Sequence, residues 1–550
     1  MTSDETVEYV KRTLSDTGIE VDRIEERSFP DERWLIAFVT QESLVAAQSV
    51  AGSLEAALNA NRESHSATYV VTFRPTLIDE PALDDPAAKG RLSSIKVDQL
   101  IQLLEARSRT SDALPSLHYV EDPRASLAAV GASRHQLIYG RRGVGKTALL
   151  LEAKRLAERQ GHIAVWMNAH IVRQLIPAEA CSVIAEAALL ALVKHGGSSS
   201  AGAYKRLEAL RGELSSDRAA GKTSEESIGR KLPDLNEALR SLLRDGVLRI
   251  FIYLDDFYLL PIAHQPKVLD VLAGMLRDCD GWLKVASIER LTRPFEPSTK
   301  VGLEVPHDAN TIDLDVTLED PEAAQQFLEE VLANYTTSVG LRGAGAVAKP
   351  EALGRLVLAS GGVPRDYLNL LASSIVVARS ARTGAREVGK EDVAVAAGSA
   401  ARGKKRDLEQ DVTSQNAEQL LHELAAISAY IKSEGFTYFL VNMADKLHAR
   451  YELLSQLVDL RFAHLVQASL SDQHRPGLRY EAYVLALSEF ADVRLKRGLN
   501  VLDLESGHWT WRLTGKARTM QRLAGTGLRD RLRQAPVLNL DGPRDFRIDA

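Results

Sequence analysis

One motif limits what this chain can fold into. Residues 140–147 read GRRGVGKT and fit the pattern G-x-x-x-x-G-K-[ST]. The apolar residues 136–139 before it predict a short strand, and residues 148–159 after it predict a helix with one apolar face. A strand, a glycine-rich turn and a helix start surround an anion with backbone N–H groups and the positive end of a helix dipole. The motif therefore predicts a phosphate site, but it does not identify the base of a nucleotide.

The positions of this phosphate loop have different expected roles. Lys146 is expected to reach the outer phosphates of a bound nucleotide, and the Thr147 hydroxyl is expected to bind magnesium. The loop as a whole, with the first helical residue after it, is the predicted nucleotide-binding segment: Gly140, Arg141, Arg142, Gly143, Val144, Gly145, Lys146, Thr147 and Ala148.

A second apolar run, at 248–254, ends in Asp255 and Asp256. A buried parallel strand that delivers an acidic side chain to a metal is the expected partner of a phosphate loop. Asp255 is therefore expected to bind magnesium, directly or through water, and Asp256 is expected to orient an attacking water as a base. The alternative, a strand that ends in a polar turn, explains one aspartate more easily than this pair.

Further strands are predicted at 163–168, 282–288 and 311–314. With the two strands above they give a five-stranded parallel sheet in a doubly wound α/β fold. Ser287, at the end of one of them, is expected to face the γ-phosphate. Roughly 75 residues separate the strands at 163–168 and 248–254, more than an ordinary crossover needs. Residues 171–246 are therefore predicted to form a helical insertion, a mobile appendage on the rim of the sheet.

Residues 319–405 are predicted to form a helical lid after the core at 115–318. Its expected helices lie at 323–334, 351–359, 366–379 and 390–400. The turn GGVPRD at 361–366 leads into the third of these helices, and its Arg365 is expected to reach back to the nucleotide phosphates. A solvated arginine at a helix start is the alternative. The basic run RGKKR at 402–406 is predicted to be a hinge.

The chain before the core predicts two parts. Residues 1–76 read as helix, strand, strand, helix and strand, a small α+β domain assigned to protein contacts because no residue cluster in it suggests chemistry. Residues 77–114 follow as a proline-rich linker and an amphipathic helix at 97–107.

The last part, residues 406–550, is expected to resemble a winged helix. Helices are predicted at 417–432 and 451–464, and a hairpin is predicted to join 465–470 to 478–484, with a second hairpin around 506–508. Residues 491–533 hold ten basic and four acidic groups, which leaves +6, and Trp509 and Trp511 lie among them. This basic tail is a candidate contact for a nucleic-acid backbone, and a solvated helical face is the alternative.

Composition narrows the class of protein. The net charge of −6 argues against coating nucleic acid by charge alone, so any such contact must be local. Cys181 and Cys279 lack metal-ligand spacing, which suits a reducing cytosol and buried thiols. The acidic N-terminus has no leader pattern, and no run of 18 apolar residues occurs. We expect a cytoplasmic protein without a membrane contact.

Together these motifs resemble the ATPases of the AAA+ and STAND superfamilies, closest in pattern to the origin-recognition and initiator-type ATPases. The resemblance covers roughly residues 115–500 and implies ATP, Mg2+ and ATPase activity. It makes GRRGVGKT the Walker A element, the strand ending in Asp255 the Walker B element, and Arg365 a second phosphate sensor. Two departures qualify it. The acidic pair is Asp-Asp instead of Asp-Glu, which implies slow hydrolysis. The sequence also shows no clear arginine finger, and it does not favour one of the three candidates, Arg277, Arg290 and Arg293, over the others.

The preferred hypothesis is a switch that binds ATP or ADP and self-assembles. It would bind DNA through its C-terminal domain and a protein through its N-terminal domain. The alternative is a signalling or anti-phage defence ATPase scaffold that recruits an effector without binding DNA. A small-molecule kinase is poorly supported, because nothing after the core suggests an acceptor pocket.

Overall fold

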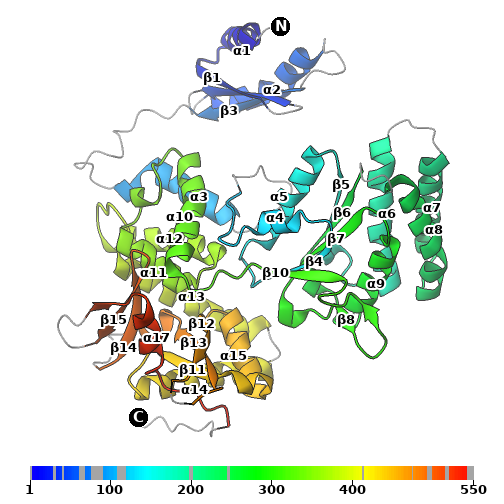
Figure 1. Cartoon of the computed structure of the whole chain (residues 1–550). Coiled ribbons are helices and arrows are strands. Elements are labelled where there is room, and N and C mark those ends of the chain that lie inside the picture. The colour runs from blue at the N-terminus through cyan, green and yellow to red at the C-terminus, as the bar shows by residue number, and fades with distance from the viewer. Residues whose placement is uncertain are drawn as a thin grey trace. The chain divides into compact units, whose positions relative to one another are not determined.

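The computed structural model describes most of the chain. The chain divides into two compact units, Met1–Ala88 and Lys89–Ala550 (Figure 1). The described residues are 3–28, 32–39, 43–60, 68–75, 91–107, 119–196, 202–243, 248–411, 414–473, 475–491, 498–514 and 520–541. Within these ranges, no helix has both the length and the apolar character needed to cross a membrane.

The first unit is a small α+β domain. Its elements are α1 (Ser3–Asp16), β1 (Val21–Ser28), β2 (Glu32–Val39), α2 (Leu44–Asn59) and β3 (Thr68–Pro75). β2 lies in the middle of the sheet, antiparallel to β1 and parallel to β3. Alternate residues of β2, such as Leu35 and Val39, are buried in one core with Val10 and Leu14 of α1. The predicted order of helix, strand, strand, helix and strand is confirmed.

A five-stranded parallel sheet forms the centre of the second unit. Its strands are β4 (His135–Tyr139), β5 (Ile163–Asn168), β6 (Ile250–Asp255), β7 (Gly281–Ser287) and β10 (Ala309–Asp313). They lie in the order β10-β4-β7-β6-β5, and every neighbouring pair is parallel. The sheet predicted from the apolar runs is therefore confirmed. A short hairpin of β8 (Phe295–Glu296) and β9 (Val301–Gly302) lies between β7 and β10 along the chain.

Helices cover both faces of this sheet. Ile252 and Leu254 of β6 face a core shared with α6 (Pro177–Gly196) and α9 (Gln265–Met275). Phe251 and Tyr253, the alternate residues of β6, face α4 (Ser126–Val130) and α5 (Lys146–Arg159). Burial on both faces explains the unbroken apolar run of this strand. The parallel arrangement also brings the carboxyl ends of all five strands to one edge, where Asp255 lies.

The long segment between β5 and β6 is part of the core, so the prediction of a mobile appendage was wrong. After η2 (Ala169–Ile171), its described residues form α6, α7 (Gly202–Ala219) and α8 (Glu225–Leu243). Leu207 and Leu214 of α7 and Leu239 of α8 are fully or almost fully buried in the same cluster as α6 and the strands. The polar stretch at 215–227 misled the prediction because it carries the solvated faces of α7 and α8 and the turn between them.

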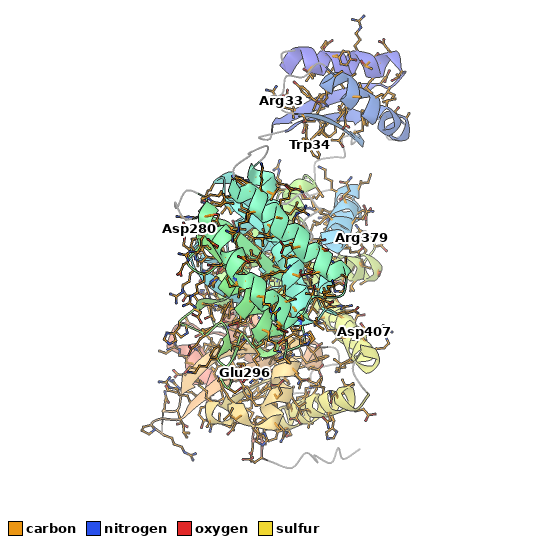
Figure 2. The ribbon with its side chains drawn as sticks, turned by 90° about the vertical axis from the view of Figure 1, so that its right-hand side faces the viewer. Arg33, Trp34, Asp280, Glu296, Arg379 and Asp407 are labelled. Carbon is orange, nitrogen blue, oxygen red and sulfur yellow. The ribbon has the colours of Figure 1, made fainter. Side chains whose placement is uncertain are left out.

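The lid consists of α10 (Pro321–Ser338), α11 (Pro350–Ser360), α12 (Pro364–Ala381) and α13 (Lys390–Asp411), with η5 (Ala344–Ala346). The predicted helix at 97–107 exists as α3 (Ile95–Arg107), preceded by η1 (Arg91–Ser93), and both pack on the lid. Arg379 of α12, labelled in Figure 2, lies on this side of the lid. It donates to the Leu92 carbonyl at 2.7 Å and pairs with Asp98 at 2.7 Å.

The predicted hinge at 402–406 was also wrong, because α13 continues through it without a break. Alanine, lysine and arginine are good helix formers, and one glycine inside a helix costs only about 1 kcal/mol. The basic run therefore marks a solvated stretch of helix. Lys404 pairs with Asp366 of the lid at 3.8 Å, and Lys405 pairs with Glu489 of the C-terminal domain at 2.9 Å.

The C-terminal domain has the order expected of a winged helix. α14 (Ser414–Ser433), β11 (Tyr438–Asn442), η6 (Met443–Leu447) and α15 (Ala449–Asp459) precede the hairpin of β12 (Ala463–Ser471) and β13 (Arg479–Leu485). β11 pairs with β13, which gives a three-stranded antiparallel sheet in the order β11-β13-β12. The helix predicted at 451–464 ends earlier, at Asp459, because Arg461 adopts a left-handed conformation and the next residues enter β12.

A second small sheet follows this winged-helix-like part. After α16 (Ser488–Ala491), strands β14 (Asn500–Glu505), β15 (His508–Leu513) and β16 (Gln521–Arg522) pair in sequence order, and α17 (Thr526–Leu532) follows. β14 and β15 form the predicted hairpin around 506–508. Two ion pairs, Arg355 with Asp503 and Lys390 with Glu505, join this sheet to the lid.

Candidate nucleotide-binding site

The phosphate loop connects the end of β4 to the first turn of α5. Gly145 is the N-cap of α5 and has a φ of 109° that favours glycine. The Lys146 ammonium is only 6% exposed, and it donates to the carbonyls of Gly140 at 2.7 Å and Arg141 at 3.0 Å. Burial lowers the pKa of Lys146 to about 8, against the opposing charges of Asp315, Asp256 and Asp255. The loop is thus held in a fixed conformation by hydrogen bonds to its own lysine, and this conformation is preformed for an anion.

The two candidate metal ligands are in contact. The Thr147 hydroxyl donates to Asp255 Oδ2 at 2.9 Å, although the residues lie 108 positions apart. Asp255 is 1% exposed, and its other oxygen, Oδ1, is buried and has no hydrogen-bond partner among the described residues. Burial, then the charge of Asp256, raises the pKa of Asp255 to about 6. A hydroxyl beside a carboxylate that has an unsatisfied oxygen suits Mg2+, which takes oxygen ligands.

The buried carboxylate gives a test that needs no nucleotide. Because the pKa of Asp255 is raised on folding, the protonated carboxyl adds to the free energy of unfolding. This contribution is fully present below about pH 4 and is lost as the pH rises through 6. Asp255→Asn is therefore expected to stabilise the metal-free protein by about 1–2 kcal/mol at pH 8, and not at pH 4. Thermal unfolding in EDTA at both pH values measures this. A lower midpoint for the variant at pH 8 would contradict the charged, desolvated state of Asp255.

Asp256 leaves the strand in a left-handed conformation, with a φ of 53°. Asn168 of β5 donates from Nδ2 to Asp256 Oδ2 at 3.3 Å, and its own Oδ1 accepts from the His170 amide. The sequence analysis missed Asn168. Its signal was available, because it ends the strand that pairs with β6, and polar residues at the carboxyl ends of neighbouring parallel strands meet.

The lid reaches the phosphate loop through the turn that carries Arg365. The Arg365 amide donates to the Gly143 carbonyl at 3.3 Å, and its side chain is exposed. A Cβ on Gly143 would lie 2.9 Å from the Cβ of Arg365, so only glycine allows this approach. Arg365 therefore begins α12 at the rim of the loop.

Arg141 fastens the loop to two other segments. Its guanidinium pairs with Asp315 at 3.1 Å and donates to the carbonyls of Val316 and Gly361, both at 3.2 Å. The sequence analysis missed Asp315, which lies two residues after the end of β10 and accepts from the Arg141 amide at 2.9 Å. Arg141 is thus a structural arginine that ties the loop to the lid.

The remaining predicted residues of the loop have different surroundings. Arg142 is exposed, and its guanidinium lies 5.4 Å from the centre of the Tyr258 ring. Tyr258 belongs to η3 (Phe257–Leu259), the short helix after Asp256. Val144 is buried in the core beside α5, while Ala148 is half-buried in the first turn of that helix.

Ser287 lies at the end of β7 beside Tyr139, fully buried. Its hydroxyl is 2.5 Å from the Thr292 hydroxyl, which also donates to the Ile288 carbonyl at 2.6 Å. In this conformation the Ser287 hydroxyl is engaged with the turn after β7, at η4 (Glu289–Leu291). A role at the γ-phosphate stays a prediction.

Two of the three arginine-finger candidates are paired within the chain. Arg290 pairs with Asp459 and lies 3.5 Å from Glu452, both on α15 of the C-terminal domain. Arg293 pairs with Glu296 at 2.9 Å (Figure 2). Both arginines are therefore engaged within the chain in this structure.

Searches with family models and with curated sequences found no match. Among solved structures, Orc1 of Aeropyrum pernix in complex with DNA has a TM-score of 0.31 and 16% identity, over 74% of this chain and 92% of that one. Cdc6p of Pyrobaculum aerophilum has 0.29 and 14%, over 74% and 95%. The RuvB branch migration motor of Thermotoga maritima has 0.28 and 14%, over 67% and 89%. These likenesses are weak, and the fold rests on the chain's own elements.

Those elements are a parallel sheet, a phosphate loop between β4 and α5, an acidic pair at the end of β6, and a helical lid that touches the loop at Gly143. Their arrangement is the one that the sequence resemblance implied. The core of this chain therefore has a doubly wound parallel α/β fold with a phosphate loop at the end of β4.

Proposed function

We propose that the chain is an ATPase switch that binds Mg-ATP at the phosphate loop and hydrolyses it slowly. The observation that carries the proposal is the contact of the Thr147 hydroxyl with Asp255, whose second oxygen is buried beside a preformed loop and has no partner within the described part of the chain. A buried carboxylate in this condition is costly unless a cation satisfies it. The Lys146 ammonium in the same loop supplies the charge that a polyphosphate requires.

Each residue of the site has a proposed role that follows from its position. Lys146 and the loop amides would hold the phosphates, while Thr147 and Asp255 would hold Mg2+, which when bound neutralises charge on the β- and γ-phosphates. Asp256, oriented by Asn168, would place the attacking water and accept its proton. Arg365 would reach the phosphates from the lid. An aspartate in the place of a glutamate holds water less closely, which is why we infer slow turnover.

The conformational output is proposed to be self-assembly and binding of DNA or a protein partner. The winged-helix-like order of the C-terminal domain supports DNA binding through that domain. The N-terminal unit, whose residues suggest no chemistry, is proposed to bind a protein partner. Nucleotide exchange and hydrolysis would then set which of these contacts form.

Two observations favour the alternative, a signalling or defence scaffold that does not bind DNA. α15, the helix before the hairpin, carries Glu452 and Asp459, and both face Arg290 of the core. In the basic tail, Trp509 is 2% exposed and donates to the Leu318 carbonyl, and Arg531 lies 4.0 Å from the centre of the Trp511 ring. These groups serve internal packing, which leaves less of the tail for a nucleic acid.

One set of measurements separates the two functions. We expect Mg-ATP to bind with measurable heat, and we expect the protein to form larger assemblies in ATP than in ADP. If the domain binds DNA, duplex DNA will stimulate ATP turnover, and the stimulation will fall steeply between 50 and 200 mM salt. Turnover that DNA does not change, with assembly that salt does not change, would favour the scaffold. Absence of heat with Mg-ATP would refute both.

A further inference from the structure

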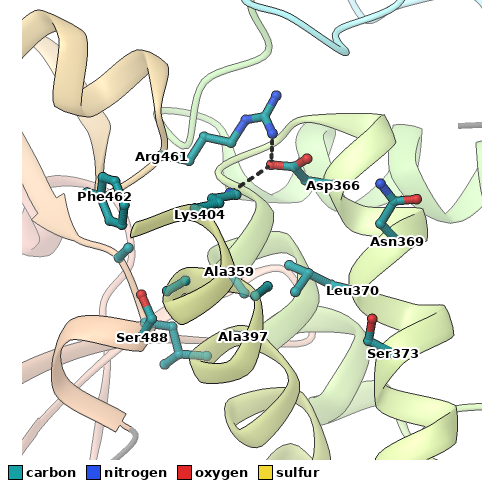
Figure 3. A pocket seen from close by; sticks show the side chains of 14 residues that line it. Ala359, Asp366, Asn369, Leu370, Ser373, Ala397, Lys404, Arg461, Phe462 and Ser488 are labelled. Carbon is teal, nitrogen blue, oxygen red and sulfur yellow. Dashed lines mark ion pairs between the residues drawn. The ribbon is translucent and has the colours of Figure 1, made fainter. Parts of the chain in front are cut away.

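The corner between α15 and β12 inserts an arginine between the phosphate loop and the lid. The Arg461 guanidinium donates to the Arg142 carbonyl of the loop at 2.5 Å and forms an ion pair with Asp366 in the first turn of α12 (Figure 3). Asp366 directly follows Arg365, the proposed phosphate sensor. One side chain of the C-terminal domain thus contacts both elements that would enclose a nucleotide.

The backbone of this corner is held in an unfavourable conformation. Arg461 has a φ of 68°, in the left-handed region that non-glycine residues rarely adopt. Such a conformation persists where surrounding contacts compensate for its cost, and it is enriched at functional positions. The contacts here are those of the guanidinium, which is only 12% exposed, and of Asp459 two residues earlier, which pairs with Arg290.

The charges around Arg461 do not balance. Lys404, whose side chain is 39% exposed, lies 3.8 Å from the same Asp366, so one buried and one partly exposed cation share one carboxylate. Burial, followed by the cations Arg141, Lys404 and Arg461, lowers the pKa of the adjacent, buried His464 to about 3. A region with excess positive charge beside a phosphate loop becomes more stable when a polyphosphate is present.

The ion cluster borders a cavity at this interface. A cavity of about 150 Å³ lies between the lid and the C-terminal domain, beside the ion cluster. Several small side chains line it, including Ala359, Ala397, Ala400 and Ser373 (Figure 3). The ion pairs of Arg461 and Lys404 with Asp366 therefore lie at the edge of this cavity.

We propose that Arg461 is a positioning residue of the nucleotide site, through which nucleotide binding and docking of the C-terminal domain stabilise each other. The inference rests on the proposed function, and it adds the residue that carries the coupling. Arg461 acts through the Arg142 carbonyl and Asp366 and does not itself contact the nucleotide. Because coupling of two binding equilibria is reciprocal, loss of the arginine must weaken both.

The test compares Arg461→Ala with Arg355→Ala in the full chain. Arg355 is a matched control because it also forms a buried ion pair between the lid and the C-terminal domain, with Asp503, away from the phosphate loop. We expect Arg461→Ala to weaken Mg-ATP binding about 5- to 50-fold. It should also raise amide hydrogen exchange at 141–146 in the ligand-free protein and remove nucleotide-induced protection of β12. Arg355→Ala should change nucleotide affinity by less than about twofold.

Two further variants keep the test decisive if Arg461→Ala fails to fold. Arg461→Lys keeps the charge beside Asp366 but replaces the planar guanidinium, whose separate nitrogens reach Asp366 and the Arg142 carbonyl, with a single nitrogen, so an intermediate effect is expected. Asp366→Asn removes the ion pairs with Arg461 and Lys404 but leaves the Arg461 contact to the Arg142 carbonyl, and it should give the same direction of change. The proposal is overturned if exchange at 141–146 in the folded Arg461 variants matches that of Arg355→Ala. Hydrogen exchange needs no ligand, so it tests the role of Arg461 in the loop separately from nucleotide binding. If the wild type binds no nucleotide, that result refutes the proposed function.

Discussion

Lys146→Ala is expected to weaken Mg-ATP binding by a factor of about 100 or more, because the variant removes a desolvated cation that would form charge-assisted hydrogen bonds to two phosphates. It also leaves the carbonyls of Gly140 and Arg141 without the donor that they have now. Calorimetric titration with Mg-ATP measures the loss, and circular dichroism checks that the variant is folded.

Lys154→Ala is the matched control for this prediction. Lys154 lies on the same helix, α5, but pairs with Glu158 at 3.1 Å outside the loop. Its removal should leave nucleotide affinity unchanged, since a partly exposed pair of this kind contributes little. If Lys146→Ala binds Mg-ATP within threefold of the wild type, the loop is not the nucleotide site.

Asp256→Asn is expected to reduce ATP turnover by about 10²- to 10⁴-fold while leaving Mg-ATP affinity nearly unchanged, since it removes a base and not a ligand. Asparagine suits the left-handed backbone at this position, so the substitution should not disturb the turn. Single-turnover hydrolysis at saturating Mg-ATP separates the chemical step from binding.

The converse variant, Asp256→Glu, tests why turnover should be slow. A longer carboxylate comes closer to a water at the γ-phosphate, so we expect faster hydrolysis with unchanged affinity. Turnover of Asp256→Asn above a tenth of the wild-type rate would assign the base to another group.

Local patterns were enough to predict the phosphate loop and the strands around it. An unbroken apolar run such as 250–254 identifies a strand buried on both faces, and the residues at its end follow from the chain direction. The proximity of Thr147 and Asp255 could be expected for the same reason, since both lie at the carboxyl edge of one parallel sheet.

Contacts made by distant segments could not be predicted in this way. Arg461 touches the Arg142 carbonyl across 319 residues, and Asp315 meets Arg141 across 174. Nothing in their local sequence distinguishes them from solvated charges. The errors at 171–246 and 402–406 have a related cause, because polar and basic residues on the solvated face of a helix resemble those of a loop when periodicity is weak.

The unbroken course of α13 has a mechanical consequence. Its 22 residues extend from the lid, where it packs on α12, to the C-terminal domain, where it contacts α16. At 1.5 Å per residue this is a rod of about 33 Å, and a continuous helix resists bending far more than a loop does. A small rotation of the lid about the phosphate loop would therefore displace the C-terminal end of α13 by a larger distance. In such a rotation α13 would act as a lever arm.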